Sequence, residues 1–136
     1  MTITELMYYG SYYRDLDEGY HLWWFDPQEN KIYQYEDLLK TFGYHSEADI
    51  LAVGAFIPLF RTDITALKYQ FILSLRSKKL QSYFDKLPEA DLDGEFNIFV
   101  EREHLIHLWG DFERKQLFED AVKWCRDNHI TGIKIE

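Results

Sequence analysis

Residues 20–35 read YHLWWFDPQENKIYQY, and this stretch decides the β part of the fold. Two runs rich in aromatic and β-branched residues, 20–25 and 31–35, flank a Pro- and Asn-containing turn, which together predict a β-hairpin. Period-2 alternation places Trp24 on one face of the first strand and Trp23 on the other. Both faces therefore carry large apolar groups, and both need cover from the rest of the chain.

The chain outside the hairpin is mostly patterned for helices. Apolar residues at helical spacing predict helices over residues 2–10, 46–53, 63–75 and 77–87. Thr2 is expected to cap the first of these, Ser46 the second, and Thr62 or Asp63 the third. Asp93 is expected to cap a helix that carries Ile98, Leu105, Leu108, Trp109 and Phe112 on one arc, and a last helix ends at Asn128. The tail, Gly132–Glu136, alternates apolar and polar residues and predicts either a third strand or a frayed end.

These patterns predict an α+β fold. We expect one mostly α-helical domain, residues 1–136, with a small antiparallel β-hairpin or three-stranded sheet near the N-terminus. A chain of 136 residues is long enough for one compact core and short for two ordinary domains.

Charge and composition exclude several classes of protein. The formal net charge of −9 repels the nucleic-acid backbone, so nucleic-acid binding is disfavoured. The longest apolar run, residues 50–60, is far shorter than the ~20 residues that a membrane-spanning helix needs. The first residues lack a hydrophobic signal segment, which predicts a cytoplasmic protein with no membrane partner. The single cysteine, Cys125, allows no intramolecular disulfide, and we expect no cofactor.

From Phe56 onward the chain resembles an uncharacterised bacterial protein family, number 158 of its series. The resemblance covers roughly the C-terminal 60% of the chain. It is carried by Phe56-Ile57-Pro58-Leu59, Asp63-Ile64, Phe71-Ile72-Leu73-Ser74-Leu75, Gly94-Glu95-Phe96 with Phe99, Trp109 with Phe112, and Ala121-Val122-Lys123-Trp124-Cys125-Arg126-Asp127-Asn128. The family has consecutive arginines where this chain has Asn97-Ile98, so the resemblance implies no anion site there. It implies a fold and no particular activity.

Aromatic residues make up 18% of the chain, and seven of the ten tyrosines fall within the first 35 residues. Tyr and Trp bury much surface and keep a polar group, which is why they are enriched at protein interfaces. The alternative is that about half of these side chains fill the core beneath the sheet. We expect a non-enzymatic protein–protein interaction or self-association module, a homodimer being one form. The expected surface consists of Tyr9, Tyr12, Tyr13, Tyr20 and Trp23.

A metal site is the enzyme alternative. His104, His107 and Asp111 have the i, i+3, i+7 spacing that places three metal-ligand types on one helix face, as a metal-dependent hydrolase could use. A solvated helix face explains the same pattern and is the stronger interpretation. Cys125 shares a helical stripe with Phe118 and Ala121, which favours a buried structural cysteine over a nucleophile.

RNA association is the second alternative. Arg76, Lys78 and Lys79 lie near Tyr83 and Phe84, a combination that can hold a nucleic-acid strand. The run Arg76-Ser77-Lys78-Lys79 is a small footprint, however, and a helix C-terminus would attract the same cations through its dipole.

Overall fold

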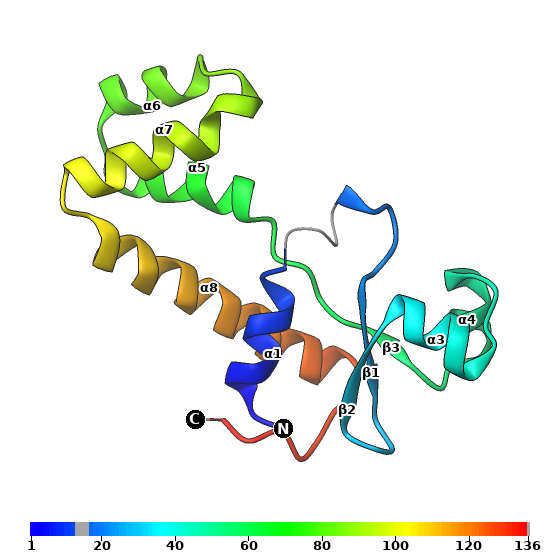
Figure 1. Ribbon diagram of the computed structural model, residues 1–136. Coiled ribbons are helices and arrows are strands. Elements are labelled where there is room, and N and C mark those ends of the chain that lie inside the picture. Colours follow the sequence, from blue (N-terminus) through cyan, green and yellow to red (C-terminus); the bar gives the residue numbers. More distant parts are fainter. Residues whose placement is uncertain (13–16, 136) are drawn as a thin grey trace. The chain divides into compact units, whose positions relative to one another are not determined.

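The computed structural model describes residues 1–12 and 17–135, which form a mostly helical chain with one three-stranded antiparallel sheet (Figure 1). The α+β prediction is confirmed. The chain divides into two compact units. We call Met1–Thr62 with Leu117–Glu136 the sheet unit and Asp63–Gln116 the helical unit, and we describe each by itself.

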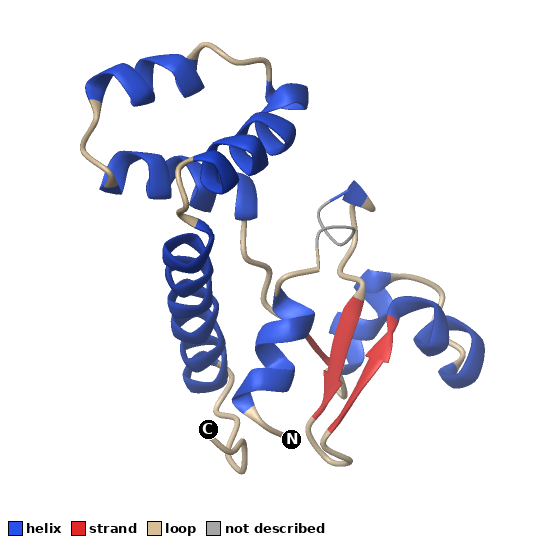
Figure 2. Ribbon diagram, turned by 60° about the vertical axis from the view of Figure 1, so that its left-hand side comes forward, coloured by secondary structure: helices blue, strands red, loops and turns tan. Residues whose placement is uncertain are grey.

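The sheet confirms the hairpin and supplies its third strand from an unexpected segment. Strands β1 (Trp23–Asp26) and β2 (Lys31–Gln34) pair in antiparallel register, and β3 (Ile57–Pro58) pairs with β1 on the other side (Figure 2). The order β2-β1-β3 leaves β3 at an edge, where a proline costs no ladder hydrogen bond. The prediction that the tail adds the third strand is wrong.

The tail instead forms an isolated parallel bridge between Thr2 and Lys134. The Ile3 N–H donates to the Lys134 carbonyl at 2.8 Å, and the Lys134 N–H donates to the Met1 carbonyl at 3.2 Å. The tail thus hydrogen-bonds to the first residues of the chain, and β3 is the strand that pairs with the free edge of β1.

Both faces of the sheet are covered, as the alternation predicted. Phe25 is buried with Ile3 and Leu6 of α1 (Ile3–Gly10) and with Ala121 and Trp124. Trp24 is buried on the opposite face with one residue each from α3 (Tyr35–Phe42), α4 (Glu47–Val53) and the segment before β3. These residues are Leu38, Ile50 and Phe56.

Helices α1 and α4 begin where their capping residues predicted. The Glu5 N–H donates to Thr2 Oγ1, and the Asp49 N–H donates to Ser46 Oγ, each at 3.2 Å. Helix α3 was not predicted from the sequence. Its N-cap, Gln34, makes no side-chain capping hydrogen bond, so no local signal marks the point where the strand becomes a helix.

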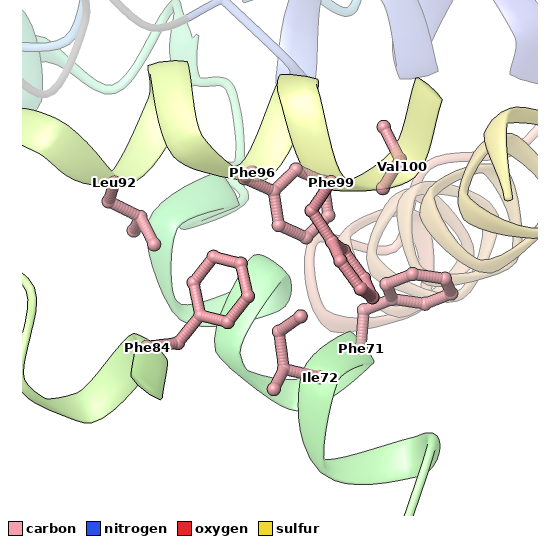
Figure 3. Packing of buried hydrophobic residues seen from close by; sticks show 7 residues of the cluster. All are labelled: Phe71, Ile72, Phe84, Leu92, Phe96, Phe99 and Val100. Carbon is pink, nitrogen blue, oxygen red and sulfur yellow. The ribbon is translucent and has the colours of Figure 1, made fainter. Parts of the chain in front are cut away.

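The helical unit packs α5 (Ile64–Ser74), α6 (Lys78–Asp85) and α7 (Glu89–Arg102) with the first part of α8 (Ile106–Asp127). The buried side chains of its core come from α5, α6 and α7 and point toward one another (Figure 3). They are Phe71, Ile72, Phe84, Leu92, Phe96, Phe99 and Val100.

The expected helix capped by Asp93 is wrong in both its start and its continuity. Helix α7 begins after Pro88, so Asp93 lies inside it. A turn then separates α7 from α8, and His104 adopts a left-handed backbone there (φ 57°). Ile98 and Leu108, which were placed on the buried arc, are each more than half exposed.

Candidate functional site

Three of the predicted aromatic residues come together in the sheet unit. The ring centroid of Trp23 lies 4.7 Å from that of Tyr9 and 5.6 Å from that of Tyr12, both edge to face. Tyr8 joins through Tyr9 at 5.3 Å. We call these four residues the aromatic cluster. Tyr9, Tyr12 and Trp23 are half-buried against one another, whereas Tyr8 is 66% exposed.

Tyr20 takes part in a different contact. Its ring stacks on that of Tyr35 at 4.2 Å, and its hydroxyl donates to Glu18 Oε2 at 3.3 Å. Loss of solvation, followed by the nearby Glu18 carboxylate, raises the pKa of Tyr20. Tyr13 lies outside the described residues. The predicted surface is therefore divided, and its largest part packs on itself.

The helix face proposed for metal binding does not form. His104 lies in the turn between α7 and α8, while His107 and Asp111 lie in α8, so the three residues do not share one helix. Asp111 accepts a hydrogen bond from Arg114 at 3.3 Å. In residues 1–12 and 17–135, no group of three His, Cys, Asp or Glu side chains could hold a metal ion.

Cys125 lines a small apolar pocket of about 130 Å³ in the sheet unit, together with Ile3, Val122, Ile130 and Ile133. Burial raises the pKa of its thiol. A raised pKa lowers the thiolate fraction at neutral pH, which is the opposite of what a nucleophile needs. Cys125 is partly exposed, whereas the sequence predicted a buried cysteine, and its raised pKa does not favour a nucleophile.

The basic run lies at a helix start as well as a helix end. Arg76 follows α5, where the helix dipole favours a cation, but Lys78 and Lys79 are the first two residues of α6. A helix N-terminus carries partial positive charge, so the dipole opposes these two lysines. The C-terminal explanation predicted from the sequence is therefore wrong for Lys78 and Lys79. The helix dipole therefore does not account for the position of Lys78 and Lys79.

A pocket of about 730 Å³ lies beside this helix start, entirely within the helical unit. It is formed by the end of α5, by α6, by the end of α7 and by the turn that follows α7. We call it the α6 pocket. Its apolar residues are Leu75, Leu80, Phe99 and Leu105, and its polar residues are Ser77, Lys79, Tyr83, Arg102 and Glu103.

The apolar residues of the α6 pocket continue the core of the helical unit. Phe99 is a core residue, and Leu75, Leu80 and Leu105 pack against that core. The Leu105 N–H donates to the Val100 carbonyl at 2.7 Å, which holds the turn that brings Leu105 toward α6. The pocket floor is thus an exposed continuation of a packed interior.

The charged groups of the pocket are unequally paired. Arg102 Nε lies 3.4 Å from Glu103 Oε1, and Glu103 is the single carboxylate that lines the pocket. Across the parts of the chain that the structure describes, Arg76, Lys78 and Lys79 have no carboxylate partner. Two cations and one carboxylate therefore line the α6 pocket, and Arg76 and Lys78 are adjacent in the sequence to residues that line it.

Tyr83 marks the outer side of the pocket. It is 51% exposed, and its hydroxyl donates to Glu95 Oε2 at 2.9 Å. That hydrogen bond to Glu95, with some loss of solvation, raises the pKa of Tyr83. The phenol therefore stays protonated at neutral pH and remains a hydrogen-bond donor.

The α6 pocket was not identified from the sequence. Its residues come from four segments between Leu75 and Leu105, and no spacing along the chain brings them together. The basic run was the one signal that pointed to this region.

Comparison with protein-family models, curated proteins and solved structures finds no match. The resemblance to the uncharacterised bacterial family stays a prediction. Within residues 1–12 and 17–135, no helix has both the length and the apolar character to cross a membrane.

Proposed function

We propose that this protein is a non-enzymatic protein–protein interaction module of the cytoplasm, and that it binds a partner segment in the α6 pocket. One observation carries the proposal: a pocket with an apolar floor lies at the start of α6, where Lys78 and Lys79 have no carboxylate partner among the described residues and the helix dipole opposes their charge.

The apolar floor supplies the driving force for binding. Its volume of about 730 Å³ lies within the range of small-ligand sites and is large enough for the side chains of a peptide segment. An apolar side chain that enters removes both surfaces from water, at about 25 cal/mol per Å² of apolar area. Anchors of this kind, seated in a pocket, provide much of the energy of known interfaces.

The aromatic cluster supports the interaction proposal less directly. Its rings are half-buried against one another, which limits the area that they offer to a partner. Tyr8 is the member with the most exposed ring. Tyr8 is therefore the position of the aromatic cluster to compare with Tyr83.

Site-specific photo-crosslinking tests the proposal. A benzophenone amino acid would replace Tyr83 in one full-length variant, Tyr8 in a second and Lys115 in a third. Lys115 is exposed on α8 and does not line the α6 pocket, so it serves as the control. After irradiation in native lysate, we expect a discrete adduct of one partner from position 83 and none from position 115.

The other outcomes separate the alternatives. An adduct from position 8 alone would move the interaction to the aromatic cluster and contradict the pocket. An adduct with the mass of two copies of this chain would identify self-association. The same diffuse adducts from all three positions would contradict a specific binding site.

A further inference from the structure

We infer that the partner segment is acidic: a peptide that places an apolar side chain on the floor of the α6 pocket and a carboxylate against Lys79 and Arg102. This inference rests on the proposed function, because it assigns the chemistry of the segment that the pocket takes.

The charge of the helical unit differs from that of the chain. The chain as a whole has a formal net charge of −9, whereas residues 63–116 contain 10 acidic and 8 basic residues. Two of these eight basic residues, Lys79 and Arg102, line the α6 pocket, and Arg76 and Lys78 are sequence neighbours of residues that line it. The less acidic of the two units thus places two of its cations in the lining of the α6 pocket.

Lys79 and Arg102 come from different helices and both line the pocket. Arg102 meets Glu103 through Nε, and a guanidinium carries four further N–H donors on its terminal nitrogens. A carboxylate that enters the pocket can therefore pair with Arg102 without displacing Glu103. Lys79 has no carboxylate partner among the described residues and offers three donors.

The start of α6 adds to this preference. The first turn of a helix presents unpaired backbone N–H groups and partial positive charge. One of these N–H groups, that of Leu80, donates to Ser77 Oγ at 3.2 Å. A carboxylate bound here would offset the unfavourable position of Lys78 and Lys79. A cationic segment would meet repulsion from the lysines and from the dipole together.

The floor of the pocket favours a peptide over a nucleic acid. Single-stranded nucleic acids bind by stacking bases on aromatic rings. Three of the four apolar residues of the pocket are leucines, whose side chains suit the aliphatic and aromatic side chains of a protein.

Selection from a random peptide library tests the inference. The full-length protein would be immobilised and used to select peptides of about 12 residues, a length that spans a pocket of this size. In parallel, the same library would be selected on Lys79→Glu and on Lys115→Glu. The second variant makes the same charge change on the exposed surface of α8, outside the pocket. Circular dichroism would verify that each variant is folded.

We expect peptides selected on the unchanged protein to contain Asp or Glu close to Leu or Phe. Lys79→Glu should bind them about tenfold more weakly and should select Lys or Arg instead, while Lys115→Glu should select acidic peptides. Fluorescence anisotropy of one selected peptide should show affinity that falls as sodium chloride rises from ~0.05 M to ~0.5 M, because salt screens the charge contacts.

Three outcomes would overturn the inference, and they separate it from the proposed function. Selected peptides that are apolar and show no preference for acidic residues would leave the pocket function standing and remove the charge preference. Failure to enrich any peptide, together with no adduct from position 83, would remove both. Binding of a labelled oligouridine that Lys79→Glu abolishes, with no peptide enriched, would assign the pocket to RNA.

Discussion

Lys68 and Asp93 form an ion pair between α5 and α7, with Lys68 Nζ 2.6 Å from Asp93 Oδ1. Lys68 is only 7% exposed, whereas the side chain of Asp93 is 74% exposed. The lysine therefore buries its aliphatic stem, passes the ring of Phe96 at 5.4 Å and meets its partner near the surface. Asp93 was expected to cap a helix, but its carboxylate instead pairs with the nearly buried ammonium of Lys68.

Removal of this carboxylate should destabilise the protein. Asp93→Ala leaves the Lys68 ammonium without its hydrogen-bonded partner, which we expect to lower the free energy of unfolding by about 1–3 kcal/mol. Glu101→Ala is the matched control, an exposed carboxylate on the same helix, and should change stability by less than about 0.5 kcal/mol. Urea unfolding measures both. Equal effects of the two substitutions would show that the ion pair contributes nothing.

Two glycine substitutions should have opposite effects on the stability of the protein. A Cβ at Gly10 would clash with the ring of Phe60, so Gly10→Ala must displace that ring and should cost about 1–3 kcal/mol. A Cβ at Gly94, inside α7, meets nothing within 4 Å. Gly94→Ala should therefore stabilise the helix by about 0.5–1 kcal/mol. Thermal melting of the two variants measures this difference, and a loss of stability in Gly94→Ala would contradict it.

Glu113 should make the protein less stable as pH rises, whereas most carboxylates in folded proteins have the opposite effect. Burial raises the pKa of Glu113, although Lys68 and Arg114 oppose the shift. The native state therefore holds this proton to a higher pH than the unfolded state, and stability contributed by the group falls as pH rises through the raised pKa. Glu113→Gln should stabilise the protein at pH 7, and the gain should disappear at about pH 3, where Glu113 is protonated in both states.

Urea unfolding at several pH values measures the effect of Glu113→Gln. Glu119→Gln, an exposed position on the same helix, is the control. A gain in stability that is the same at every pH would show that the titration of Glu113 is not its source.

Cys125 should react slowly with alkylating reagents. Burial raises the pKa of the thiol, so the native protein holds less of the reactive thiolate than a free cysteine at the same pH. We expect iodoacetamide to modify the native protein about tenfold more slowly than the protein unfolded in guanidinium chloride. Mass spectrometry of timed samples measures both rates. Equal rates would show that the thiol is accessible in the native protein.

The helix starts were the most predictable part of the structure. Thr2, Ser46, Asp63 and Ser77 each accept a backbone N–H three residues ahead, and a capping residue followed by an apolar stripe is visible in the sequence. Helix α3 shows the limit of this signal, since it begins at Tyr35 without a side-chain cap.

The candidate site was predictable only in fragments. The sequence identified Tyr9, Tyr12 and Trp23 as aromatic candidates, and the structure brings their rings together. It also identified Lys78 and Lys79 but attributed their charges to a helix C-terminus, although the predicted helix over 77–87 already places them at a helix start, as α6 does.

By itself, the sequence determined the hairpin, its need for cover on both faces and most of the capped helices. These features depend on turn residues, on alternation and on hydrogen bonds between groups three or four residues apart. Only the tertiary structure decided that Ile57–Pro58 supplies the third strand, that Asp93 reaches Lys68 and that Phe99 and Leu105 form a pocket with Leu80. Each of these contacts joins segments that are far apart in the sequence. The spacing of residues within one segment does not indicate which other segment it will pack against.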